Sequence, residues 1–179
     1  MPEPRILIAG IGNIFLGDDA FGVEVVAALA RHTFPDTVRV VDFGIRGLEL
    51  AFALLDGYDT VILVDAMPRR GTPGQVYLVE VERDERAPSS DPSAPLFDMH
   101  RLDPAKVLRL VPAMGGRLGR LFVVGCEPVP LDTSEVTQPG LSAAARAAIP
   151  VAVEIICQLV QECHDGAPTG ASNVERVTV

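Results

Sequence analysis

The chain has 179 residues, of which 48% are hydrophobic and 5% aromatic, and its 15 basic and 24 acidic residues give a net charge of −9. A chain of this length fits one domain that buries roughly 70% of its unfolded surface, so its core needs no disulfide or metal staple. The acidic balance, without a Lys/Arg cluster interleaved with aromatics, argues against a nucleic-acid or membrane partner. Three cysteines without a C-x-x-C pair, and no signal peptide, predict a cytoplasmic location and structural thiols.

Strand and helix patterns alternate along the chain. Aliphatic runs predict strands at residues 5–9, 38–42, 60–65, 75–81 and 120–125. Helical patterns follow at 20–32, 47–55, 103–111 and about 142–162, and Pro150 predicts a kink or a break in the last helix. This alternation predicts an α/β fold, a three-layer sandwich with a mainly parallel, twisted sheet of about five strands flanked by helices.

Two segments depart from the alternation. Residues 83–95 are rich in charge, Ser and Pro, and we expect them to form a surface excursion. Residues 164–179 have few apolar side chains until their end, which predicts a flexible C-terminal tail. The sequence therefore predicts a single domain over residues 1–163, followed by a tail over 164–179.

A Gly-rich run leads from the first strand into the first helix. Its position is that of a phosphate-binding turn, but Asp18 and Asp19 stand where a phosphate would bind. The spacing of Gly10, Gly12 and Gly17 also does not give G-x-G-x-x-G, which disfavours a nucleotide-dependent oxidoreductase. Two carboxylates at this turn are suited to a cation, and the plain alternative is that one of them caps the helix.

Further polar residues are expected at the same edge of the sheet, because ligands bind outside the carboxyl ends of the strands in open α/β folds. Asp42 ends the second predicted strand, Asp65 ends the third, and His100 precedes the third helix. Taken singly, the acids are explained as turn caps and the histidine as an ordinary loop residue. Together with Asp19 they form the ligand set of a partly open divalent metal site.

The motifs around these residues resemble those of the hydrogenase maturation endopeptidases over roughly residues 5–160. In that family an acid of the first motif, the Asp after the third strand and a downstream His bind metal, and by motif these are Asp19, Asp65 and His100, which are also the expected catalytic residues. The matching motifs, in chain order, are Gly10-Ile-Gly-Asn13, Gly17-Asp-Asp-Ala-Phe-Gly22, Asp42-Phe-Gly44, Gly47-Leu-Glu-Leu50, Val64-Asp-Ala66, Gly71-Thr-Pro-Gly74, His100 and Val124-Gly-Cys-Glu-Pro128.

The resemblance implies a cytoplasmic enzyme that removes a short C-terminal peptide from the precursor of a [NiFe]-hydrogenase large subunit after nickel insertion. Two assignments stay open: Asp18 competes with Asp19, and Phe43 intervenes where the family often has a second glycine after Asp42. We expect the enzyme to be a monomer.

The chemistry is expected to come from metal, water and carboxylates, because the chain has no G-x-S-x-G and no H-E-x-x-H motif. The favoured hypothesis is that nickel held by the precursor is bridged by Asp19, Asp65 and His100, so that the metal reports completed assembly. Two carboxylates and one imidazole do not select among metals, so we expect zinc or cadmium to substitute in vitro. The alternative is a non-enzymatic nickel-binding chaperone of hydrogenase assembly that uses the same three ligands.

Overall fold

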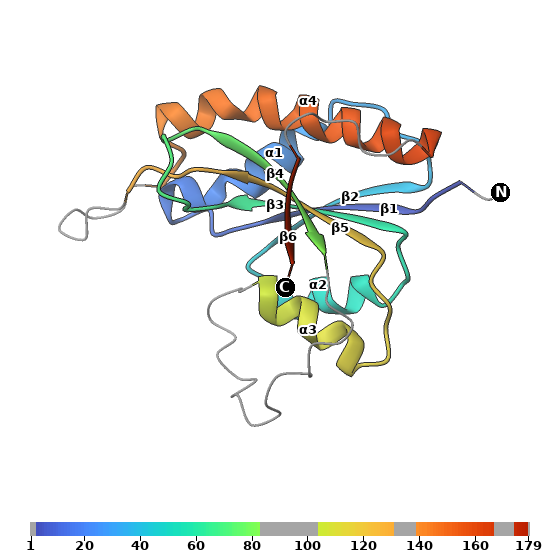
Figure 1. Ribbon diagram of the computed structural model, residues 1–179. Helices are drawn as coiled ribbons and strands as arrows, with labels where there is room; N and C mark the ends of the chain where they lie inside the picture. The colour runs from blue at the N-terminus through green and yellow to red at the C-terminus, as the bar shows by residue number, and fades with distance from the viewer. Residues whose placement is uncertain (1–2, 83–103, 131–138, 167–173, 179) are drawn as a thin grey trace.

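The computed structural model describes residues 3–82, 104–130, 139–166 and 174–178. Its centre is a six-stranded sheet with the order β2-β1-β3-β5-β4-β6 (Figure 1). The strands are β1 (Ile6–Ile11), β2 (Val38–Gly44), β3 (Thr60–Ala66), β4 (Val76–Glu82), β5 (Arg120–Cys126) and β6 (Val174–Thr178). The helices are the short 3-10 turn η1 (Gly17–Ala20), α1 (Phe21–Leu29), α2 (Gly47–Leu54), α3 (Pro104–Ala113) and α4 (Ala143–Asp165).

The sheet is mainly parallel. Strands β2, β1, β3 and β5 are parallel to one another. Among the described strands, β4 and β5 form the one antiparallel pair, and β6 pairs in parallel with β4. All six residues of β1 are buried, which is the pattern of a strand covered on both faces. The predicted α/β class and parallel sheet are confirmed, and each of the five predicted strands is present within about two residues of its expected bounds.

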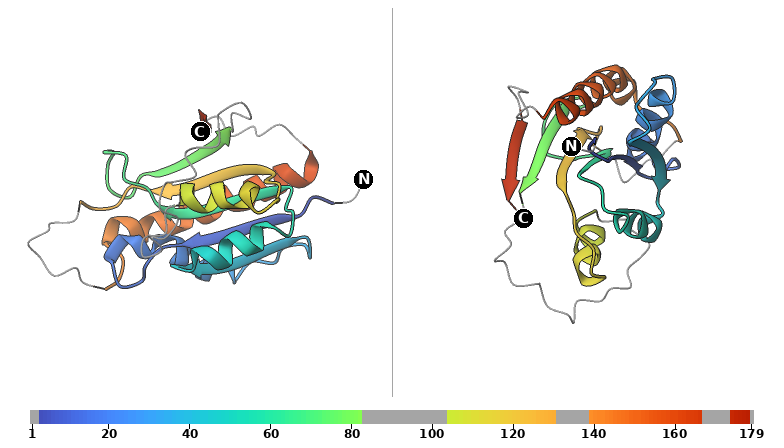
Figure 2. Two further views of the ribbon diagram at one scale, coloured as in Figure 1. Left: turned by 90° about the horizontal axis from the view of Figure 1, so that it is seen from below. Right: turned by 90° about the vertical axis from the view of Figure 1, so that its right-hand side faces the viewer.

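Helices cover both faces of the sheet. Figure 2 shows α1 and α4 in one layer and α2 and α3 in the other. Successive side chains of β1 point to opposite faces of the sheet. Ile6 and Ile8 pack in the apolar cluster with α1 and α4. Leu7, Ala9 and Ile11 pack in the cluster with α2 and α3. The sheet therefore has a separate apolar core on each side.

Helix α4 runs through Pro150 as one helix of 23 residues, so the expected possibility of two separate helices is wrong. The Ser142 hydroxyl caps its start by accepting from the Ala145 N–H at 3.1 Å, and Gly166 ends it in the left-handed conformation. Ala148 and Ala152 are buried on either side of the proline, and this packing outweighs the lost backbone bond. By length and composition alone, α4 could also cross a membrane, but one of its faces packs on α1 and the sheet.

The C-terminal region differs from the expected tail. Helix α4 continues to Asp165, and residues 174–178 form β6, which pairs in parallel with β4 from Leu78↔Val174 to Glu82↔Thr178. Without β6, the backbone N–H and C=O groups on that side of β4 would have no partner strand. Pairing with β6 gives these groups hydrogen-bond partners. The predicted surface excursion at 83–95 lies outside the described residues.

Candidate active site

The glycines of the first turn are required by close backbone approach. Gly12 has φ +133°, and a Cβ built on it would lie 1.7 Å from the Asp19 carbonyl oxygen. A Cβ on Gly22 would lie 2.0 Å from the Val64 carbonyl oxygen, so α1 begins directly against β3. These two glycines therefore let η1 and α1 pack closely onto the end of the sheet.

Asp18 is buried and has its carboxylate fully engaged by the connection between β5 and α4. Its Oδ1 accepts from the Ser142 N–H at 2.7 Å, and its Oδ2 accepts from the Ser142 hydroxyl at 2.9 Å and from the Val129 N–H at 2.8 Å. Charge-assisted bonds to two segments more than 100 residues away give Asp18 a structural role.

Asp19 lies half-buried beside it and is used differently. Its Oδ2 accepts from the Asn13 N–H at 2.7 Å, which closes the loop between β1 and η1. Within the described residues, its other oxygen receives no hydrogen bond. Neither η1 nor α1 has a side-chain N-cap, so the alternative that Asp18 or Asp19 caps this helix is wrong.

Asp65 is the penultimate residue of β3, the strand that pairs with β1. The residue before it, Val64, is in register with Gly10 of β1. Burial first, and the negative charge of Asp19 second, raise the pKa of Asp65 to about 7, while the bond from the Ala66 N–H at 2.8 Å acts in the opposite direction. The fold therefore brings Asp19 of η1 and Asp65 of β3 close enough to interact electrostatically. A cation would relieve their repulsion, and perturbed carboxylates of this kind are typical of functional sites.

Asp42 lies at the same end of β2, in register with Gly10, and is exposed. The register between β1 and β2 shifts at this point, because Ile11 pairs with Gly44 and leaves Phe43 as the extra residue of a bulge. Phe43 is buried in the core with α2 and α3. The insertion that separates Asp42 from its glycine is thus absorbed by packing.

His100, the third predicted ligand, lies outside the described residues. Among the residues that are described, no group of three or more His, Cys, Asp and Glu side chains is placed to hold a metal. The structure therefore brings together two of the three predicted site residues, Asp19 and Asp65, and the metal assignment stays a prediction.

Exposed apolar side chains lie on two connections at the same edge of the sheet, and the sequence patterns did not predict them. The loop before η1 carries Ile14, Phe15 and Leu16, which are 49%, 69% and 44% exposed. The connection from β2 into α2 carries Ile45 and Leu48, which are 61% and 45% exposed. The loops are joined by the bond from the Gly12 N–H to the Gly44 carbonyl at 3.0 Å. Their signal in the sequence is a run of three apolar residues inside a Gly- and Asp-rich turn. We call these five residues the apolar rim.

Comparison with known proteins gives a consistent result. The sequence model of the family described as hydrogenase maturation protease matches residues 23–159. The hydrogenase expression/formation protein HupD of Rhizobium leguminosarum bv. viciae is 34% identical over 161 residues, which cover 89% of this chain and 76% of HupD. Hydrogenase 2 maturation protease of Escherichia coli is 33% identical over 160 residues, covering 88% of this chain and 92% of that protein.

Solved structures agree with the sequence relatives. The hydrogenase maturating endopeptidase HybD from E. coli superimposes with a TM-score of 0.69 at 31% identity, covering 88% of this chain and 93% of HybD. The hydrogenase 2 maturation peptidase from Thaumarchaeota archaeon SCGC_AB-539-E09 gives a TM-score of 0.64 at 30% identity, covering 88% and 98%.

Proposed function

The chain belongs to the hydrogenase maturation protease family and is an endopeptidase, and on this basis we propose that it removes a C-terminal peptide from the nickel-loaded precursor of a [NiFe]-hydrogenase large subunit. The observation that carries the proposal is the coupled pair of Asp19 and Asp65 at the carboxyl end of the sheet. A non-enzymatic chaperone would use the same residues, but the relatives are named proteases and peptidases.

In this mechanism nickel arrives as part of the substrate. Asp19 has a free carboxylate oxygen among the described residues, and Asp65 is poised between its protonated and ionised forms near neutral pH. Both features suit groups that receive a cation from a partner, because carboxylate oxygens and imidazole are accepted ligands for nickel. His100 is proposed as the third ligand from its motif position.

The apolar rim is proposed to receive the precursor. An exposed apolar patch is a usual mark of a protein-binding surface, and this one lies on the edge of the sheet that carries the two carboxylates. Contacts there would hold the precursor while its metal reaches Asp19 and Asp65. Binding energy from the rim is separate from the chemistry, so the two contributions can be tested separately.

The decisive experiment measures the mass of the large subunit. Precursor loaded with nickel and precursor verified to be metal-free are each incubated with the purified protein. We expect loss of the C-terminal peptide only from the nickel-loaded form, and no loss with Asp19→Asn or Asp65→Asn. Asp36→Asn, an exposed acid before β2 at the other end of the sheet, is the matched control and should trim normally.

Two outcomes would contradict parts of the proposal. Efficient trimming of metal-free precursor would overturn nickel recognition and leave the endopeptidase role intact. A nickel-loaded precursor whose mass never changes would overturn the choice of substrate.

We also propose that the protein acts as a monomer in the cytoplasm. The three cysteines are unpaired in the structure, as expected of a reducing compartment. Sedimentation equilibrium of the purified chain tests the oligomeric state, and fractionation of cells that express it tests the location.

A further inference from the structure

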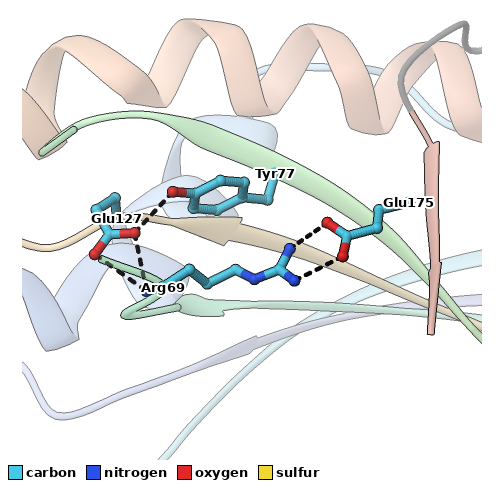
Figure 3. A network of polar contacts seen from close by, with 4 residues as sticks. All are labelled: Arg69, Tyr77, Glu127 and Glu175. Carbon is cyan, nitrogen blue, oxygen red and sulfur yellow. Dashed lines mark hydrogen bonds and ion pairs between the residues drawn. The ribbon is translucent and has the colours of Figure 1, made fainter. Parts of the chain in front are cut away.

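A buried carboxylate at the end of β5 holds the loop that follows Asp65. Glu127 is only 4% exposed, and its two oxygens accept from the Arg69 N–H at 3.1 and 2.9 Å. The Tyr77 hydroxyl donates to the same carboxylate at 2.7 Å (Figure 3). The neighbouring N–H groups of Arg70 and Gly71 also favour its charged form, as their effect on the Glu127 pKa shows. The loop between β3 and β4 thus presents backbone N–H groups to one anion, and the Arg69 N–H bonds it directly.

The conformation of this loop explains why an anion is needed. Arg70 has φ +62° and is the only non-glycine residue with positive φ in the described part of the chain. A left-handed residue can turn the N–H groups beside it inward, and such a concavity binds anions. The conformation costs free energy in a residue with a Cβ and persists only where its surroundings hold it. Here the chain supplies its own anion, Glu127.

Glu127 is suited to this task because it stays ionised. Burial raises the pKa of Glu127, but the hydrogen bonds from Tyr77 and from the N–H groups of Arg69, Gly71 and Arg70 outweigh burial and leave the pKa below its usual value. A Cβ on Gly71 would lie 2.0 Å from the Tyr77 hydroxyl oxygen, so no side chain fits there. The carboxylate, the tyrosine and the loop backbone form one tightly packed unit.

The backbone of β5 fixes both ends of the same loop. The Met67 N–H donates to the Cys126 carbonyl at 2.8 Å, and the Gly74 N–H donates to the Glu127 carbonyl at 2.8 Å. Asp65 lies two residues before Met67, near the end of β3, where it is in register with Gly125 of β5. The loop therefore continues directly from the strand end that carries this carboxylate.

The C-terminal strand adds a second, weaker attachment. The Arg69 guanidinium forms a two-pronged ion pair with Glu175 of β6, with one N–O distance of 2.7 Å, and its centre lies 5.4 Å from the centre of the Tyr77 ring. Arg69 therefore binds Glu127 through its backbone and β6 through its side chain, as Figure 3 shows. The ion pair is solvent-exposed, with side chains 32% and 53% exposed, so we expect it to contribute much less than Glu127.

We propose that Glu127 is a positioning residue for the peptidase reaction: it anchors the loop between β3 and β4 and thereby holds Asp65 against Asp19, while β6 supports the same loop through Arg69. The proposal deepens the proposed function and rests on it, because Asp65 matters only if it acts on the precursor.

The test combines activity with hydrogen exchange in the full-length protein. Glu127→Gln keeps the shape of the side chain but removes the charge that accepts the bond from the Arg69 N–H and that the neighbouring N–H groups stabilise. We expect kcat for trimming of the nickel-loaded precursor to fall about 10- to 100-fold, because a small misplacement of a reacting group has an effect of this size, while KM changes less than about twofold, as for an interaction that does not bind the ground state. Exchange of the Arg69 amide, which donates to Glu127, should accelerate about tenfold or more.

Two matched variants separate positioning from general destabilisation. Ile156→Val removes one methylene from the fully buried face of α4, away from the loop, and should leave kcat and loop exchange within about twofold of wild type. Glu175→Gln should accelerate loop exchange less than Glu127→Gln does, because it removes only the exposed ion pair.

Each outcome decides a separate point. Unchanged kcat in Glu127→Gln overturns the positioning role, whether or not the loop exchanges faster. A loss of kcat in Ile156→Val equal to that in Glu127→Gln also overturns it, since the effect would then be general. A wild-type protein that does not trim the precursor contradicts the proposed function instead, and the loop exchange of Glu127→Gln then decides by itself whether Glu127 anchors the loop.

Discussion

Two pairs of carboxylates lie toward the same end of the sheet and use their oxygens in opposite ways. Asp18 and Glu127 are buried at 7% and 4% exposure and accept several hydrogen bonds each. Within the described part of the chain, Asp19 and Asp65 each accept one bond, and their mutual repulsion contributes to the raised pKa of Asp65. A buried carboxylate whose oxygens accept several hydrogen bonds therefore has a structural role. Two carboxylates that repel each other and accept few hydrogen bonds are available for a ligand.

The strongest effect on stability is expected at Asp18. Asp18→Ala leaves the Val129 N–H and the Ser142 N–H and hydroxyl without their charged acceptor. Because each buried donor left unpaired costs about 1–3 kcal/mol, we expect the free energy of unfolding to fall by about 3–4 kcal/mol in urea titrations. Asp19→Ala should change it by less than about 1 kcal/mol. Equal losses in both variants would erase the distinction between the two acids.

The next effect concerns the coupled pair and has the opposite sign. The folded-state pKa of Asp65, about 7, lies above its ordinary value of 3.8, so ionisation of this group destabilises the folded state. The stability it contributes is complete below pH 3.8 and is lost as the pH rises to about 7. Asp65→Asn has no ionisable group at this position, so it does not lose this stability. Its free energy of unfolding should exceed that of wild type by about 2–4 kcal/mol at about pH 8 and differ little from it at about pH 3.5. Urea midpoints at the two pH values test the sign, and a variant that is less stable at the higher pH would contradict it.

A smaller effect is expected at the apolar rim. Phe15→Ser removes the most exposed side chain of the rim, which is 69% exposed. It should raise KM for the precursor about tenfold with kcat unchanged, as for the loss of a contact that binds the substrate and the transition state equally. Val151→Ser is the matched control, because Val151 is 48% exposed on α4 in the other layer. Steady-state kinetics of the two variants decide the matter, and equal KM values would show that the precursor does not use the rim.

The weakest effect is expected at the C-terminus. Removal of residues 167–179 takes away β6, which pairs with β4 on one side only. We expect the free energy of unfolding to fall by about 1 kcal/mol, because the main core lies elsewhere and exposed ion pairs contribute little. Thermal unfolding of the truncated chain measures this. A fall as large as that in Asp18→Ala would show that β6 is an integral part of the domain.

Much of the fold could be predicted from local patterns. The buried strand Ile6–Ile11 reads as a continuous apolar run, and the acids that end β2 and β3 follow such runs directly. The position of Asp65 at the carboxyl edge follows from the strand pattern and the rule for parallel sheets. By contrast, β6 could not be predicted, since five residues with only two valines become a strand by pairing with β4.

The site divides in the same way. Local sequence patterns were enough to predict that acids lie at the carboxyl ends of the strands, because strand periodicity and helix starts are properties of neighbouring residues. The role of each acid depends instead on tertiary contacts. Asp18 and Asp19 are adjacent in the sequence, and they differ because Val129 and Ser142 reach Asp18 from more than 100 residues away. Glu127 holds the loop after Asp65 from 62 residues further along the chain, and contacts of that range arise only when the sheet brings its strands together.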